Sequence, residues 1–314
     1  MALTFEQHLA ATYDKTVLDR NKSADQWSDS SFLMGMEETG GLERVSGGND
    51  LKLILNYRAN PAAGTLATDT TLTSTTKTEV LTMVEADWAI VQAPINWSFR
   101  DEDLNTGKER RVDLVSELVD NALTSHDDVI EDAFFAATAT DGLESLFTIF
   151  TEDGTGTVHG VVSGTETWWK NQFKDWGSDT GATLLADYTT LYNSCAKGSS
   201  GRKPNIIISS ATMHAAYEAA LTPNQRYANV NKASGGFTEV QFKTIPYLWS
   251  SAAGTGDDAF MFNTRDTKLY VVRGAWRKRR TAIEHVNALM MNMKTYSLLQ
   301  FATKNRSRGG RLFT

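Results

Sequence analysis

The segment RVDLVSELVDNALTSHDDVIEDAFFAAT, residues 111–138, carries the longest helical pattern in the chain. Its apolar residues recur at spacings of three and four, with one gap at His126, and neither Gly nor Pro interrupts them. The residues of this stripe are Val112, Val115, Val119, Ala122, Val129, Ala133 and Ala137. At ~1.5 Å per residue the helix would be roughly 40 Å long, which is longer than most helices of globular proteins. The sequence therefore predicts one long helix over residues 111–138.

The other side of this predicted helix is strongly acidic. Its carboxylates are Asp113, Glu117, Asp120, Asp127, Asp128, Glu131 and Asp132. Two interpretations stay open: an ordinary solvated face, or a scaffold helix that displays acid to a partner. We expect His126, next to two of these carboxylates, to be solvated.

The two halves of the chain carry opposite charge. Residues 1–160 contain 11 Lys and Arg against 28 Asp and Glu, and residues 161–314 contain 20 against 10, which gives −17 and +10 and sums to the net charge of −7. Domains often differ in charge incidentally, but such a split also suits a protein whose copies pack acid against base. Self-assembly is therefore one hypothesis that the composition supports.

The basic residues gather in two clusters. The first, RGAWRKRR at residues 273–280, contains Arg273, Arg277, Lys278, Arg279 and Arg280. The second, at residues 304–311, contains Lys304, Arg306, Arg308 and Arg311. Two interpretations stay open. Such cations could contact nucleic-acid phosphates without base specificity, or they could pair with the acidic surface of the same or a neighbouring subunit. Because the other half of the chain is acidic, we favour pairing and expect acid on residues 101–132 to oppose base on residues 273–311.

The region before the long helix predicts an arm and a β-hairpin. Residues 1–48 mix short amphipathic pieces with glycine breaks, and their aromatic residues indicate packing on some surface. Alternating apolar residues at 50–58 and 79–99 predict two strands, joined by a Thr-, Ala- and Gly-rich loop at 61–78. An isolated two-stranded ribbon is marginal in water, so we expect it to need a partner surface.

The region after the long helix predicts a mixed helix and strand fold. Residues 141–182 are Gly-rich and irregular. The later pattern predicts helices at 184–197 and 211–221, strands at 205–209, 237–249, 259–263 and 268–273, and a long strand at 281–301. The fold class is therefore predicted as α+β.

The sequence predicts no catalytic, cofactor or metal site, and we expect no enzyme. The string at Gly154–Gly160 lacks the ending of a phosphate loop, and the five histidines are dispersed without ligand spacing. The single Cys195 excludes a disulfide framework and is expected to be buried and structural. No apolar stretch approaches the ~20 residues of a membrane span, and no signal peptide is evident, so we expect no membrane association.

Several strings follow one another in order along the second half of the chain: DGLESL (141–146), TETWWKN (165–171), LYNSCAKG (191–198), PNIIISS (204–210), LTPNQRY (221–227), GFTEVQFK (236–243) and SLLQFATKNRSR (297–308). Their order and content resemble the major capsid proteins of tailed bacteriophages. The resemblance covers most of residues 111–314. It implies the Hong Kong 97-type capsid fold, and none of these strings is a catalytic motif.

This resemblance implies a division of the chain. An N-terminal arm would occupy residues 1–48 and an extended β-hairpin loop residues 49–108. A peripheral domain with the spine helix 111–138 would take residues 109–182 and 283–314. An axial α/β domain would take residues 183–282. In that family the arm and loop lie on neighbouring subunits, which would explain a hairpin that cannot stabilise itself.

The resemblance also implies function and partners. We expect a structural protein that assembles in the host cytoplasm into an icosahedral virion capsid of hexamers and pentamers around double-stranded DNA. Separate scaffolding and portal proteins, with or without decoration proteins, would be its partners, and the basic clusters would face DNA or a neighbouring subunit. Two alternatives stay open: the shell protein of an encapsulin-like cellular nanocompartment, and a non-specific nucleic-acid-binding protein.

Overall fold

The computed structural model describes residues 31–58, 60, 63, 79–104, 114–177, 181–196, 202–221, 240–254, 256–286 and 288–314. The predictions for the first 30 residues, for Asp113 and for most of the loop at 61–78 lie outside these residues. The rest of the predicted arm forms α2 (Ser31–Glu38) and β1 (Leu42–Val45). Phe32 and Met36 of α2 are fully buried, so this part of the arm packs on its own chain.

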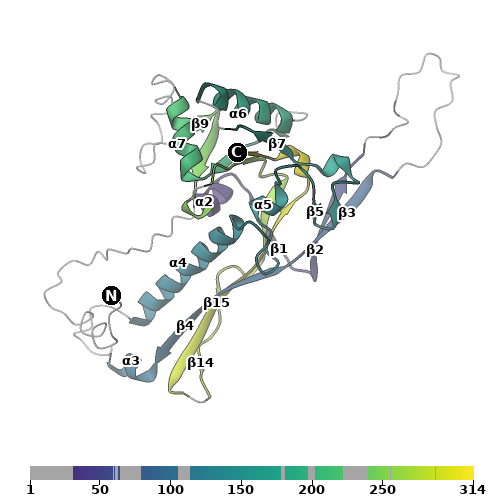
Figure 1. Cartoon of the computed structure of the whole chain (residues 1–314). Helices are drawn as coiled ribbons and strands as arrows, with labels where there is room; N and C mark the ends of the chain where they lie inside the picture. Colours follow the sequence, from purple (N-terminus) through teal and green to yellow (C-terminus); the bar gives the residue numbers. More distant parts are fainter. Residues whose placement is uncertain are drawn as a thin grey trace, which may run out of the picture.

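Two six-stranded sheets form the body of the molecule (Figure 1). The long sheet has the order β1-β12-β15-β13, and β4 and β14 also pair with β15. Its further strands are β4 (Ala89–Ser98), β12 (Thr267–Val272), β13 (Lys278–Arg279), β14 (Ile283–Glu284) and β15 (Met290–Thr303). The second sheet has the order β7-β16-β11-β8-β10-β9. Its strands are β7 (Gln172–Asp175), β8 (Ile206–Ser209), β9 (Val240–Phe242), β10 (Ile245–Trp249), β11 (Ala259–Phe262) and β16 (Gly310–Phe313).

Helices lie against both sheets. The long helix α4 (Leu114–Phe134) runs alongside β4, and α6 (Gly181–Cys195) and α7 (Ala211–Ala220) lie at the second sheet (Figure 1). The shorter elements are α3 (Phe99–Leu104), α5 (Leu146–Ile149), β5 (Thr157–Val158), β6 (Val161–Val162) and the 3₁₀ turns at Thr167–Trp169, Ser251–Ala253 and Arg306–Arg308. The predicted α+β class and the predicted order of the main helices and strands are confirmed.

The long helix is confirmed, but its predicted end at residue 138 is wrong. It ends at Phe134, which is fully buried and packs its ring 5.2 Å from that of Phe301. A tight turn follows, in which Asp141 and Gly142 have φ angles of 48° and 85° that no right-handed helix contains. The described helix is therefore about 32 Å long at 1.5 Å per residue.

The predicted hairpin is confirmed in its outer half only. Strand β2 (Asp50–Asn56) pairs antiparallel with β3 (Leu81–Asp87), and we call this pair the ribbon. The predicted second strand, 79–99, breaks at Trp88, and its inner half β4 pairs instead with β15 along ten residues. One face of the ribbon packs on Trp169 and Tyr270 of its own chain, while Ile54, Leu81 and Met83 are exposed.

The predicted return strand also begins later than expected. Strand β15 starts at Met290, because the chain first doubles back through β14 and closes a turn with the amide of His285 donating to Met290 O at 2.9 Å. Strand β12 belongs to the long sheet, whereas β7 and β16 belong to the second sheet. Each sheet therefore contains strands from both of the domains predicted on either side of residues 183 and 282.

Candidate assembly surface

Arg277 of the first basic cluster is bound to the long helix of its own chain. Its Nε and Nη2 lie 3.0 and 2.6 Å from the two carboxylate oxygens of Asp127, a bidentate pair. The Asp127 side chain is 10% exposed and that of Arg277 is 41% exposed. The Arg277 amide donates to Ser297 Oγ at 2.8 Å, and its guanidinium lies 5.2 Å from the Trp276 ring. Of the predicted acid and base residues, the structure thus brings Asp127 and Arg277 together within one chain.

The acidic side of the helix is divided between the interior and the surface. Asp127 and Glu131 are buried, and Glu131 accepts a hydrogen bond from Ser250. Asp120 and Asp132 are exposed, and Glu117 and Asp128 are half-buried. One side of α4 therefore points carboxylates into the interior of the chain, and the other side exposes carboxylates to solvent.

His126 is fully buried, so the prediction of a solvated histidine is wrong. Its Nδ1 lies 3.3 Å from Asp127 Oδ1, and its ring meets Trp276 edge-on with centroids 6.4 Å apart. Among the described residues its Nε2 has no hydrogen-bond partner. The gap that His126 makes in the apolar stripe is thus a buried position, whereas Val129, assigned to the stripe, is half exposed.

The other cations of the first cluster lie on the surface. Arg273, Lys278, Arg279 and Arg280 are exposed, and β13 pairs Lys278 with Tyr296 and Arg279 with Thr295 of β15. Arg280 places its guanidinium 5.2 Å from the Tyr296 ring. Within the described part of the chain none of these four cations has a carboxylate partner.

Arg306 is buried, which contradicts its assignment to an interface or DNA-facing cluster. Its guanidinium donates to Thr151 Oγ1 at 2.9 Å, to Thr155 O at 3.0 Å and to Ser163 Oγ at 3.3 Å, and further to the backbone oxygens of Ile149 and Gly154. Burial lowers the pKa of Arg306 to about 10. The side chain therefore organises the loop at residues 149–163 of its own chain.

His159 lies in the same interior and was not singled out by the sequence. Burial, together with the nearby charge of Arg306, lowers its pKa to about 4, so the ring is neutral near pH 7. The neutral Nε2 accepts a hydrogen bond from the amide of Thr303 at 3.3 Å. The Gly- and Thr-rich sequence at residues 154–160 gave no signal that His159 is buried.

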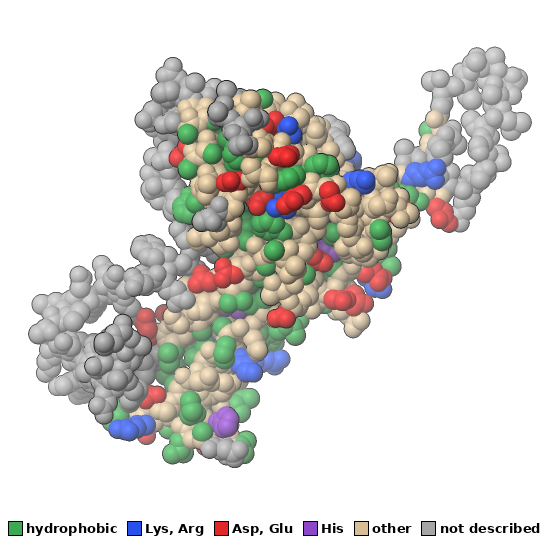
Figure 2. Space-filling view, in the orientation of Figure 1, with side chains coloured by type: hydrophobic (Ala, Val, Ile, Leu, Met, Phe, Trp, Pro, Cys, Tyr) green, Lys and Arg blue, Asp and Glu red, His purple; other side chains and the backbone are tan. Residues whose placement is uncertain are grey.

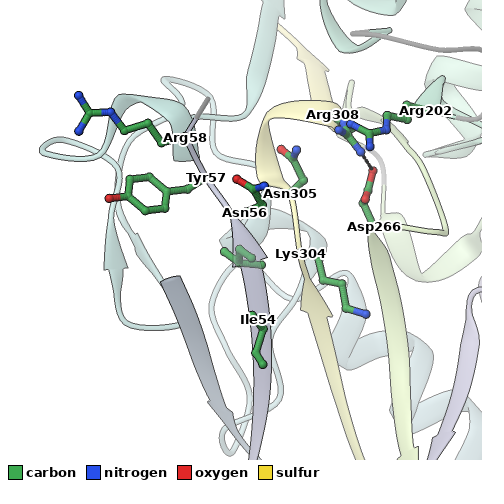
Figure 3. A pocket seen from close by; sticks show the side chains of 10 residues that line it. Ile54, Asn56, Tyr57, Arg58, Arg202, Asp266, Lys304, Asn305 and Arg308 are labelled. Atoms are coloured by element: carbon green, nitrogen blue, oxygen red, sulfur yellow. Dashed lines mark hydrogen bonds and ion pairs between the residues drawn. The ribbon is translucent and has the colours of Figure 1, made fainter. Parts of the chain in front are cut away.

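A cavity with four cations among its ten lining residues, which we call the basic pocket, lies where the ribbon meets the body. It has a volume of about 450 Å³ and is lined by Ile54, Leu55, Asn56, Tyr57, Arg58, Arg202, Asp266, Lys304, Asn305 and Arg308. Figure 3 shows Arg308 directed at Asp266, with Arg202 at the same end and Tyr57 and Arg58 at the other. Nη1 of Arg308 lies 2.8 Å from Asp266 Oδ2, and both side chains are less than one fifth exposed. Four separate segments build this pocket, so no local motif predicted it.

Apolar side chains are exposed on the hairpin formed by β14 and the start of β15, which we call the apolar tip. Its exposed residues are Ile283, Val286, Leu289 and Met290, of which Val286 is 95% exposed. Hydrophobic side chains are visible at this end of the molecule in Figure 2. A contiguous exposed apolar patch of this kind marks an interaction surface more often than an isolated residue does.

The part of the chain that the structure describes has no group of His, Cys, Asp or Glu that could hold a metal ion. Within the same residues no helix is long and apolar enough to cross a membrane. Cys195 is buried, as predicted.

Comparisons with known proteins give the fold. No protein-family model and no curated protein matches the chain. A chain of the cyanophage A-1(L) capsid is 14% identical, with a TM-score of 0.60 over 96% of this chain and 98% of that chain. The capsid of the native GTA particle matches at 9% identity and a TM-score of 0.63, over 97% and 98%.

An encapsulin also matches. The encapsulin of the holo-SrpI complex from Synechococcus elongatus PCC 7942 is 11% identical, with a TM-score of 0.62 over 100% of this chain and 96% of that chain. The chain therefore has the fold of phage capsid and encapsulin subunits over nearly its whole length. The capsid fold implied by the sequence resemblance is confirmed at this level, while its finer division into domains stays a prediction.

Proposed function

We propose that this chain is the major capsid protein of a tailed DNA bacteriophage, a structural subunit that assembles into an icosahedral shell. In this proposal α4 is the spine helix and the long sheet belongs to the peripheral domain. The second sheet with α6 and α7 is the axial domain, and the ribbon is the base of the extended loop. The shell would assemble from hexamers and pentamers in the host cytoplasm and enclose the genome in the virion.

The observation that carries the proposal is the pair of exposed apolar surfaces on a chain with this fold. The ribbon exposes Ile54, Leu81 and Met83, and the apolar tip exposes four large side chains near the opposite end of the molecule. An isolated monomer leaves both apolar surfaces in water. Burying them would stabilise an assembly, because apolar burial contributes roughly 25 cal/mol per Å². Subunits that meet through both surfaces recover that free energy at many interfaces at once.

The proposed partners follow from the exposed charge. The cations Arg273, Lys278, Arg279 and Arg280 are available for a neighbouring subunit or for DNA phosphate, and electrostatics at such interfaces sets orientation more than affinity. Scaffolding and portal proteins would complete the assembly. No residue of the described chain is assigned a catalytic role, and the proposed action is mechanical.

The encapsulin-like alternative rests on the match to the Synechococcus elongatus shell protein, which is as similar in fold as the phage capsids. The contents of particles from the native source separate the two. Nuclease-protected double-stranded DNA supports the phage capsid, and protein cargo without DNA supports the nanocompartment. A dissociated subunit that binds DNA with a steep fall in affinity as salt rises, yet never forms particles, would favour the nucleic-acid-binding alternative.

The test is negative-stain microscopy of the full chain, expressed alone and with any scaffolding protein from its source. Closed shells of uniform diameter are expected in at least one case, and monomers in both cases would contradict the proposal. Val286→Asp should abolish shells without unfolding the subunit, because the side chain is almost fully exposed. Val162→Asp is the matched control, since Val162 is an exposed valine outside both apolar surfaces.

A further inference from the structure

We infer that the basic pocket binds carboxylates of α3 from a second copy of this chain, joining neighbouring subunits head to tail. The carboxylates are Asp101, Glu102 and Asp103 of α3, which we call the acidic end. The inference rests on the proposed function, because the second copy is a neighbour in the same shell.

The basic pocket has an unbalanced positive charge. It is lined by Arg58, Arg202, Lys304 and Arg308 against one carboxylate, Asp266, which is already bound to Arg308. Among the described residues neither Arg58 nor Arg202 has a hydrogen-bond or ion-pair partner. The Lys304 ammonium lies 6.0 Å from the Tyr270 ring. Figure 3 shows the Arg202 and Arg308 side chains together at one end of the pocket, whereas the Arg58 guanidinium points away from them at the other end. A concave surface lined by an excess of one sign of charge attracts the opposite sign, so the pocket favours an anionic ligand.

The shape of the pocket favours side chains over duplex DNA. A cavity of about 450 Å³ holds several side chains. Duplex DNA instead presents one charge per ~1.7 Å along a convex surface, which open surface cations contact better than cations lining a hollow. The exposed cations of residues 273–280 meet that need, whereas the basic pocket fits a small projecting group of carboxylates.

The acidic end is such a group. The helix α3 has no buried residue, and Figure 1 shows it at the end of the molecule far from the ribbon. Its side chains are held in place: Asp101 Oδ2 accepts from the Ser98 amide at 3.0 Å, and Glu102 Oε2 accepts from Trp97 Nε1 at 3.1 Å. Each ionised carboxylate has about four acceptor positions, so these bonds leave room for arginine donors.

The separation of the two sites decides the kind of contact. Because the acidic end and the basic pocket lie far apart in one copy, they meet only between copies. A contact between two different surfaces of identical chains is heterologous, and it closes into a ring when the rotation between copies allows. A ring of this kind is what a hexamer or pentamer of the proposed shell requires.

Charge reversal tests the inference. The pocket variant Arg58→Glu with Arg202→Glu should reduce the yield of shells at least tenfold, while circular dichroism and thermal unfolding of the subunit stay unchanged. Adding Glu102→Lys and Asp103→Lys to the same chain should restore shells, because the lysines of α3 are then attracted to the glutamates of the variant pocket. Arg44→Glu is the matched control, since Arg44 is an exposed arginine on β1 outside the pocket and should leave the yield unchanged.

The outcomes separate the inference from the proposed function. Wild-type chains that never form shells would contradict the proposed function itself. Normal shell yield from the pocket variant, or rescue by Asp120→Lys with Asp132→Lys in place of the α3 reversals, would overturn the inference alone. So would a pocket variant that assembles normally but loses packaged DNA, which would identify the pocket as a phosphate site.

Cysteine cross-linking is a second measurement that does not depend on charge. The native Cys195 is buried, so a short bismaleimide should react only with introduced cysteines. Shells of a chain with both Arg202→Cys and Asp103→Cys should give a ladder of covalent multimers in a denaturing gel. A mixture of singly substituted chains should stop at dimers. Shells that give monomers alone would contradict the contact.

Discussion

The two arginine-rich segments look alike in sequence and have opposite structural roles. In residues 273–280 the cations are exposed on a narrow hairpin, and among the described residues only Arg277 is paired with a carboxylate. In residues 304–311, Arg306 is fully buried, and Arg308 and Arg311 pair with aspartates. The first segment presents its cations on the surface, whereas the second buries Arg306 and Arg311 and places Lys304 and Arg308 in the lining of the basic pocket. Counts of positive charge do not distinguish them, since the difference lies in which carboxylates, hydroxyls and backbone oxygens surround each side chain.

Truncation of Arg306 is the strongest test of the difference between the two segments. Arg306→Ala should destabilise the subunit by about 4 kcal/mol, because several buried acceptors lose their donors at about 1–3 kcal/mol each. Urea unfolding of the dissociated subunit measures the change. Arg279→Ala, the matched surface change, should stay within about 0.5 kcal/mol. Equal effects of the two substitutions would show that the segments do not differ as described.

The interior around Arg306 should also make stability depend on pH. The pKa of His159 is lowered from 6.5 to about 4 by burial and by Arg306, so below pH 6.5 the unfolded chain binds the proton more readily than the folded one. The stabilisation is complete above pH 6.5 and decreases as pH falls towards 4, by up to roughly 3 kcal/mol.

Unfolding measured between pH 7 and pH 4 checks this dependence. His159→Asn should flatten it, and asparagine tolerates the positive φ of 51° at this position. The exposed His285 serves as the control, and His285→Asn should leave the slope unchanged. His214, whose pKa is also lowered by burial, contributes with the same sign, so a residual slope is expected in the variant.

The pair of Asp127 and Arg277 should have an intermediate effect. A double-mutant cycle with Asp127→Asn and Arg277→Gln should give a coupling free energy of about 1–2 kcal/mol. Its charge-assisted bidentate geometry strengthens the pair, while the partial exposure of Arg277 weakens it. A coupling free energy near zero would show that the pair with Asp127 does not stabilise the fold and that Arg277 behaves like the other exposed cations of its segment.

The smallest effect on folding is expected at the exposed strand β13. Lys278→Glu with Arg279→Glu should change the unfolding free energy by less than about 0.5 kcal/mol, since neither side chain has an ion partner within the described chain. The informative measurement is the shell: loss of packaged DNA with assembly intact would assign these cations to phosphate, and loss of assembly would assign them to a neighbouring subunit.

Periodicity in the sequence was enough to predict the long helix, the ribbon and the main strands, because these elements depend on patterns within one segment. It failed where tertiary contacts decide. Trp88 divides a continuous apolar alternation because residues 89–98 find a better partner in β15 than in β2. His126 is buried because Trp276, far away in sequence, packs against it.

The candidate surfaces were predicted less well for the same reason. Exposure of Arg273 and of residues 278–280 agrees with a surface cluster, yet Arg306 has the same chemistry and lies in the interior. The basic pocket joins residues 54–58, 202, 266 and 304–308, and only the folded chain brings them together.

The strand order has a consequence for how the subunit is made. Strand β15 is an interior strand of the long sheet, and β16 lies between β7 and β11 in the second. Neither sheet can therefore be completed during translation until residues 290–313 have left the ribosome. Strand β1 pairs with β12, which lies more than 200 residues later in the chain. Such long-range pairing slows folding and leaves strand edges exposed to aggregation. A chain cut short before residue 290 could complete neither sheet, so it could not reach the fold described above.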